Sequence, residues 1–170
     1  MKSEKPKIRK IQEKLDFDKL LKLLLIFGII LTTGFILYHI LKPKSGYITF
    51  GILNSDMSAD DYPTNTLVGE NISFYIFIGN HLNRELNFRL DVLIGDNNTY
   101  LALNHPTNGS SYLNITSNIL NGVDWISNLI NVSFSEPGIN RLIIAELWII
   151  NADLTEKFYN SLYTRLNVTL

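Results

Sequence analysis

A run of 22 predominantly apolar residues near the N-terminus constrains this chain more than any other feature. Between Leu20 and Leu41 the sequence reads LLKLLLIFGIILTTGFILYHIL, and Lys22 is its only Lys, Arg, Asp or Glu. As a helix the run is roughly 33 Å long at about 1.5 Å per residue, which matches a hydrocarbon core of about 30 Å. The sequence therefore predicts a membrane-spanning helix over residues 19–41.

A cleaved signal peptide is the alternative. Its apolar region would be about 7–15 residues long, with small residues at a cleavage site. This run is longer, and residues 38–43, Tyr-His-Ile-Leu-Lys-Pro, offer no such site. We expect an uncleaved signal-anchor that crosses the cell membrane once.

The charges on either side of the run differ. Residues 1–22 contain eight Lys or Arg, and only Lys42 and Lys44 follow the run directly. The positive-inside rule then predicts a cytoplasmic N-terminus and an extracellular body at residues 45–170. This body has five basic and twelve acidic residues, a formal net charge of 5 − 12 = −7. Such a body repels nucleic acid, whereas the basic end suits anionic lipids, so the predicted partners include the bilayer and exclude nucleic acid.

Residues 1–18 are predicted to be a basic cytoplasmic arm. Ile8, Ile11 and Leu15 recur at helical spacing, and the lysines beside them are candidates for contact with the membrane surface: Lys7, Lys10 and Lys14. The arm is either an amphipathic helix on the inner leaflet or a mostly disordered charge cluster that sets topology. We favour the disordered cluster.

Two small residues in the predicted span indicate a contact with another helix. Gly28 and Thr32 are four residues apart, so they lie on one face of a helix. Small side chains at this spacing let a second helix approach closely. Gly28 and Thr32 are therefore the candidate helix-contact residues.

Residues 47–170, after a linker at 42–46, have the pattern of an all-β domain. Residues 86–94, LNFRLDVLI, alternate apolar and polar side chains as a half-buried strand does. Similar runs between turn residues predict strands at 47–53, 72–78, 86–94, 99–103, 111–116, 129–134, 141–150 and 158–169, with room for one helical turn in 118–125. Seven to eight strands favour an antiparallel β-sandwich of immunoglobulin-like type, with a jelly roll or small barrel as the alternative.

Asparagine occurs nineteen times in residues 45–170 and nowhere in residues 1–44. Six of these asparagines lie in N-x-Ser/Thr sequons, where about three would arise by chance at this Ser and Thr content. The candidate N-glycosylation sites are Asn71, Asn97, Asn108, Asn114, Asn131 and Asn167. All six belong to the predicted extracellular side, and we expect crowding at Asn71 and Asn131 because both begin strands.

The segment Tyr62–Phe74, YPTNTLVGENISF, combines turn residues with the start of a strand. Pro63 fixes its own φ and Gly69 can take a positive φ, so the segment suits a crossing from one sheet edge to the next strand. The motif YPTN-x-x-VGEN, followed by an aromatic strand that ends in Gly79-Asn80-His81, resembles an archaeal membrane-protein family, domain of unknown function 1616. The later Leu147-Trp148 and the closing strand are similar to the same family.

The resemblance extends over residues 47–170 and implies an archaeal, membrane-anchored, outward-facing β-sandwich without an assigned activity. Family members often carry several spans, whereas one is predicted here.

The sequence has no recognisable catalytic, cofactor or metal site. It lacks Cys, HExxH, GxSxG and a Gly-rich phosphate loop. The acids Asp56, Asp60 and Asp61 share one loop, but solvated loop acids are a commoner explanation than Ca²⁺ ligands. Tyr159 and Tyr163 are four apart on the last strand and are expected on one face, where they cover the sandwich or line a binding surface.

These observations favour a non-enzymatic, membrane-anchored interaction module that needs no cofactor. We expect an accessory subunit of a larger membrane or cell-envelope complex, with a homo-oligomer as a further possibility. The alternative is a glycosylated surface or S-layer-associated protein that acts in adhesion or carbohydrate binding.

Overall fold

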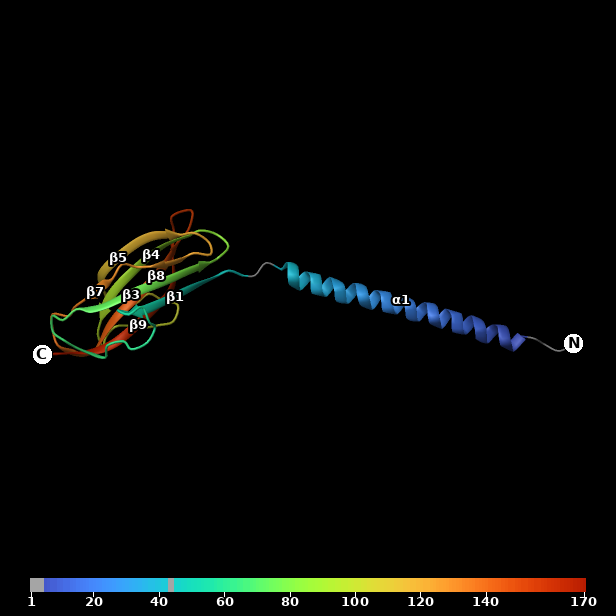
Figure 1. Ribbon diagram of the computed structural model, residues 1–170, viewed down its shortest axis with the longest axis horizontal. Coiled ribbons are helices and arrows are strands. Elements are labelled where there is room, and N and C mark those ends of the chain that lie inside the picture. Colours follow the sequence, from blue (N-terminus) through green and yellow to red (C-terminus); the bar gives the residue numbers. More distant parts are fainter. Residues whose placement is uncertain (1–4, 43–44) are drawn as a thin grey trace. The chain divides into compact units, whose positions relative to one another are not determined.

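The computed structural model describes residues 5–42 and 45–170, with side chains from Phe17 onward. The chain divides into two compact units, Met1–Lys44 and Ser45–Leu170. The first contains one helix and the second contains nine strands in two sheets (Figure 1).

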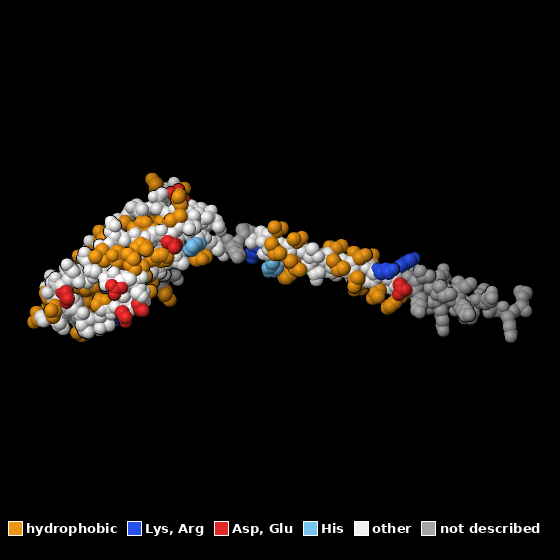
Figure 2. All heavy atoms as spheres, in the orientation of Figure 1, with side chains coloured by type: hydrophobic (Ala, Val, Ile, Leu, Met, Phe, Trp, Pro, Cys, Tyr) orange, Lys and Arg blue, Asp and Glu red, His pale blue; other side chains and the backbone are white. Residues whose placement is uncertain are grey.

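Helix α1 extends over Lys5–Leu41 without a break. Its segment Phe17–Leu41 has a mean hydropathy of 2.5 and is long and apolar enough to cross a membrane. None of the side chains in the apolar window of this segment is buried within the described residues, and hydrophobic side chains lie along its surface (Figure 2). Its length and composition suit a membrane anchor.

The disordered arm that we favoured is wrong for the backbone from Lys5 onward, because this part already belongs to α1. Lys, Glu, Gln and Leu, which dominate residues 7–15, are good helix formers, and Pro6 lies in the first turn, where proline is tolerated. The side chains of Lys7, Lys10 and Lys14 lie outside the described residues.

The second unit is an immunoglobulin-like β-sandwich, as predicted. Sheet A has β3 at its centre, with β1 on one side and β6 and β7 in succession on the other. Sheet B has the order β2-β9-β8-β4-β5. The strands are β1 (Tyr47–Asn54), β2 (Asn65–Leu67), β3 (Ile72–His81), β4 (Leu86–Gly95), β5 (Ser110–Ile119), β6 (Asp124–Ile126), β7 (Ile130–Val132), β8 (Gly138–Ile150) and β9 (Glu156–Thr169).

Three strand predictions need correction. There are nine strands rather than seven to eight, because the three-residue strands β2 and β6 were not predicted. Strand β2 pairs parallel to β9. The predicted helical turn in 118–125 is absent, since this segment contains the end of β5, a turn and β6. The predicted strand at 99–103 is part of a loop at residues 96–109.

The YPTN segment carries the chain from sheet A to sheet B and back. After β1 the chain crosses to form β2 beside the last strand, and Gly69, at φ 79°, turns it into β3 in sheet A. A residue with a side chain would be strained at this φ, so the glycine is required by the crossing. The Tyr62 hydroxyl fixes the segment to sheet A by donating to the carbonyl oxygen of Ile52 at 2.6 Å.

The core lies between the two sheets and is built from alternate residues of each strand. In β4 the inward positions Leu86, Phe88, Leu90 and Val92 are at most 1% exposed. Phe88 meets Trp125 from β6 edge-to-face, with 5.1 Å between ring centroids, so the sheets interlock through aromatic packing.

Candidate interaction surface

The outward positions of sheet A form a surface with one carboxylate, Asp124, and no Lys or Arg. We call this surface the A face. Its residues alternate with the core positions of β1, β3, β6 and β7: Tyr47, Thr49, Gly51, Leu53, Ser73, Tyr75, Phe77, Gly79, His81, Asp124, Ile126 and Asn131. In a domain with five basic and twelve acidic residues, a surface with a single carboxylate is distinctive.

The strand register brings the apolar members of the A face together. Phe77 at the centre of β3 is paired with Gly51 on one side and with Ile126 on the other. Leu53 is paired with Tyr75 in the neighbouring row. Figure 2 shows hydrophobic side chains gathered in bands between scattered acidic ones on the visible side of the domain. On the A face, Ile126 remains 43% exposed, so apolar area is open to solvent.

The outer face of sheet B is different, because a loop of the same chain covers part of it. Leu93, Leu142 and Ile144 form a second buried cluster there, and Leu101 from the 96–109 loop packs on them. The loop is fixed by its Thr107 N–H, which donates to Glu146 Oε1 at 2.5 Å. No second cluster forms over the A face within the described residues. The loop therefore gives sheet B the cover that sheet A lacks.

Charged side chains occupy much of the remaining outer face of sheet B. Arg89 donates to both carboxylate oxygens of Glu156 at 2.8–3.1 Å, pairs with Asp91 and stacks over Trp148 at 4.7 Å. The Asn114 amide also donates to Asp91. These contacts pair the charged side chains of this face with one another.

Tyrosine side chains partly cap the free edge of sheet A. Ile48 and Ile52 belong to the edge strand β1, and their carbonyl oxygens accept hydrogen bonds from Tyr159 and Tyr62, at 3.2 and 2.6 Å. Each of these bonds occupies one acceptor site that an added strand would otherwise use. A partner is thus better accommodated on the A face than along this edge.

The expectation that Tyr159 and Tyr163 share a face is wrong. The pairing of β8 with β9 shifts between Leu147 and Trp148, which leaves Tyr159 as an extra residue and reverses the alternation. Tyr159 packs against the core, whereas Tyr163, opposite Ile144, points outward and is 48% exposed with Arg165 over its ring.

The sequon asparagines lie outside the core. All but Asn167 are exposed, and Asn167 is half-buried, with its amide donating to Asn65 at 3.3 Å. Asn71 and Asn131 are exposed as well, and the expected crowding at these two sites remains a prediction. The Asn131 side chain nevertheless accepts a hydrogen bond from Ser73 at 2.6 Å. Whether any sequon carries a glycan remains a prediction.

The candidate helix contact remains a prediction, and the local geometry is compatible with it. A Cβ placed on Gly28 would meet nothing within 4 Å, so the helix surface is open there. The Thr32 hydroxyl donates back to the Gly28 carbonyl at 2.9 Å and therefore needs no partner in lipid. Together the two residues leave a shallow area that a second helix can fill.

The predicted loop acids lie around a polar cleft of about 610 Å³. Asp56, Asp60 and Asp61 line it with Glu70 from the YPTN-x-x-VGEN motif. Within the described residues, no group of three His, Asp or Glu side chains is arranged to hold a metal ion. The amide of Asn54 organises this loop instead, by donating to the Asp60 carbonyl and accepting from two backbone N–H groups.

Glu70 gives this loop a dependence on pH. Its carboxylate accepts hydrogen bonds from the Leu67 N–H and the Thr66 hydroxyl, both at 2.9 Å, and these bonds lower its pKa from the ordinary 4.5. When the pKa of a carboxyl group is lower in the folded state, the ionised group stabilises the fold fully at a pH above its pKa in the unfolded chain. This contribution is lost as the pH falls through the pKa of the folded state. We expect Glu70→Gln to lower the melting temperature at pH 7 and to leave it nearly unchanged well below pH 4.5.

Thermal unfolding followed by tryptophan fluorescence at both pH values measures this effect. Glu136→Gln is the control, because Glu136 is exposed and has no hydrogen-bond partner within the described residues. An equal loss of stability from Glu70→Gln at both pH values would contradict the assignment.

Neither a protein-family model nor a curated protein matches this sequence. Solved structures are similar to it at low identity. The CARDB domain of the PF1109 protein from Pyrococcus furiosus, solved in complex with di-metal ions, is 13% identical over 76% of this chain and 93% of that one, with a TM-score of 0.47. The PmoD soluble domain from Methylocystis is 14% identical over 72% and 91%, with a TM-score of 0.40. Similarity at this level transfers no ligand or partner to this chain.

Proposed function

We propose that this chain is a non-enzymatic interaction module, anchored in the cell membrane by one helix, whose A face docks on a partner protein. The N-terminus lies in the cytoplasm and the β-sandwich outside, in an archaeal cell envelope if the family resemblance holds. The module serves as an accessory subunit of a larger membrane or cell-envelope complex. The observation that carries this proposal is the apolar row around Phe77, which carries no charge and lies in an otherwise acidic domain.

The charge of the domain favours a different protein as the occupant of the A face. A second copy would bring another domain of formal net charge −7 close to the first, and an anionic lipid surface would also repel the domain. A partner with an apolar centre and a neutral or basic rim fits best. The helix face at Gly28 and Thr32 supplies a second contact with the same partner inside the membrane.

The mass of the particle extracted from native membranes in mild detergent tests this function. We expect a particle well above the 19.4 kDa of the chain, with one companion at fixed stoichiometry that mass spectrometry identifies. A monomer with heavy glycans would contradict the proposal. That outcome would favour the glycosylated surface or adhesion protein, the second candidate, which the exposed sequons support.

A further inference from the structure

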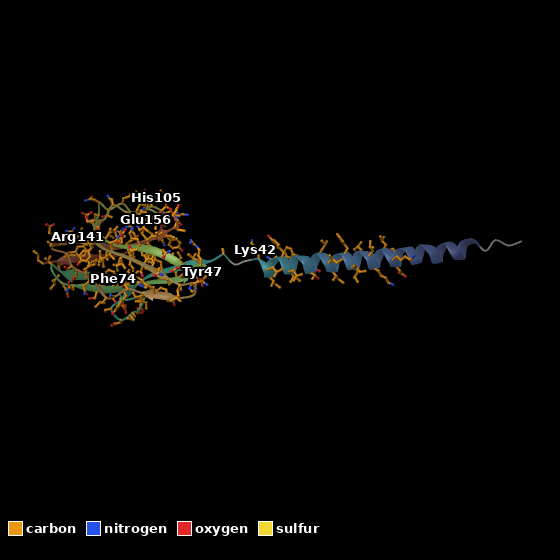
Figure 3. The ribbon with its side chains drawn as sticks, turned by 90° about the horizontal axis from the view of Figure 1, so that it is seen from above. Lys42, Tyr47, Phe74, His105, Arg141 and Glu156 are labelled. Carbon is orange, nitrogen blue, oxygen red and sulfur yellow. The ribbon has the colours of Figure 1, made fainter. Side chains whose placement is uncertain are left out.

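Arg141 lies between two clefts at one end of the sandwich. The clefts have volumes of about 300 and 320 Å³, and both are lined by Ile94, Phe134 and Arg141. Figure 3 shows Arg141 toward the end of the domain that lies away from Tyr47. This site is separate from the A face, since none of the lining residues, which come from β4, β5, β8 and neighbouring loops, is an A-face residue.

The local backbone places the Arg141 guanidinium. The pairing of β8 with β9 shifts between Gly138 and Arg141, and Asn140 within this bulge has a φ of 53°. A bulge of this kind re-aims the side chain that follows it. The guanidinium then lies directly on Gly138, where an added Cβ would overlap Arg141 Nε. A side chain at position 138 would displace the guanidinium from this place.

The guanidinium is incompletely satisfied. One terminal nitrogen of Arg141 donates to the Pro137 carbonyl at 3.1 Å, while Nε is buried and has no partner in the described part of the chain. Asp96 and Glu136 line the two clefts, but neither forms an ion pair with Arg141. An unpaired buried donor on a cation is costly, and an incoming anion would remove this cost.

The first cleft offers further donors beside the guanidinium. Asn98, Asn108 and Ser110 line it with Thr99. The Asn108 side-chain oxygen already accepts from the Tyr100 N–H at 2.6 Å. Its amide N–H groups can donate to another acceptor in a chain without a glycan at this sequon. The cleft thus combines an arginine and polar donors with the apolar side chains of Ile94 and Phe134. Such a lining can bind a small molecule that has a carboxylate and further polar groups.

We propose that the Arg141 cleft binds a carboxylate group. A carboxylate accepts two parallel hydrogen bonds from a guanidinium fork. For Arg141 this pairing requires the side chain to turn its buried Nε toward the cleft. The volume of the cleft accommodates one sugar ring or one to two amino acids. The carboxylate therefore belongs to an acidic sugar or to the C-terminus of a peptide, and these two sources are separated by experiment.

Calorimetric titration of the full chain in detergent tests the site. The probes are glucuronate with glucose as its neutral counterpart, and tri-alanine with its C-terminal amide. We expect one acid to bind saturably and its neutral counterpart not to bind, and the acid that binds identifies the source.

Arg141→Met should weaken this binding at least tenfold, because a charge-assisted hydrogen-bond pair is lost. Arg165→Met, which removes an exposed arginine over Tyr163, should leave it unchanged.

Gly138→Ala provides a second variant that keeps every charge. It should weaken binding because the added Cβ displaces the guanidinium. Near-ultraviolet circular dichroism confirms that each variant is folded. The proposal would be overturned if neither acid bound, or if an acid and its neutral counterpart bound equally. It would also be overturned if a folded Arg141→Met chain bound the acid as well as the wild type does.

Discussion

Ile126→Lys is expected to abolish the native complex while the domain remains folded. Ile126 is 43% exposed on the short strand β6, so a lysine there can extend into water in the free chain. In the complex its ammonium would be buried against Phe77 and an apolar partner surface, and an unpaired charge in such a contact costs several kcal/mol, roughly a thousandfold in affinity. Co-purification of the companion from native membranes measures the loss.

Leu154→Lys is the matched control for this variant. Leu154 is 82% exposed in the turn between β8 and β9, outside the A face, and receives the same charge. It should leave the complex intact. If both lysine variants retained the companion, or lost it equally, the A face would not be the docking surface.

Asn80→Ala is expected to cause a large loss of stability. Asn80 is fully buried at the end of β3, and its side chain makes three hydrogen bonds. The amide donates to the carbonyl oxygens of Arg84 and Ile119 at 2.8 and 2.9 Å, and the side-chain oxygen accepts from the Leu82 N–H at 3.0 Å. One side chain thus joins the β3–β4 turn to the end of β5.

Alanine would leave these backbone groups without their partner in a buried place, at about 1–3 kcal/mol each. We expect a total loss of about 3–5 kcal/mol in the free energy of unfolding, measured by denaturant unfolding with tryptophan fluorescence. Asn87→Ala changes an exposed asparagine on the next strand and should stay within about 0.5 kcal/mol of the wild type. A loss from Asn80→Ala no greater than that from Asn87→Ala would contradict the assigned role.

The sequence predicted those elements whose signal is local. Residues 86–94 alternate between a buried and a polar face, and β4 forms at Leu86–Gly95. Strand β2 has no such alternation, because its three residues are held by the last strand, about a hundred residues later in the chain. The 99–103 segment resembles a strand because Leu101 is apolar, but its apolar side chain serves to cover the outer cluster of sheet B.

The two proposed binding surfaces were harder to recognise from the sequence. One feature of the sequence does indicate the A face, because apolar residues occupy both faces of β3. The outward residues are Tyr75 and Phe77, and the inward ones are Phe74, Ile76 and Ile78. Bulges in the pairing of β8 with β9 place Tyr159 and Tyr163 on opposite faces of the strand. A bulge in the same pairing also sets the position of Arg141. No local sequence pattern encodes such a shift in register.

Photo-cross-linking from the centre of the A face is the most direct test of the proposed docking. A benzophenone amino acid is introduced in place of Phe77 in one chain and in place of Tyr163, on the outer face of sheet B, in another. After irradiation of native membranes, the account predicts a discrete adduct with the companion from position 77 and none from position 163. An adduct from position 163 alone, or from neither position, would contradict it.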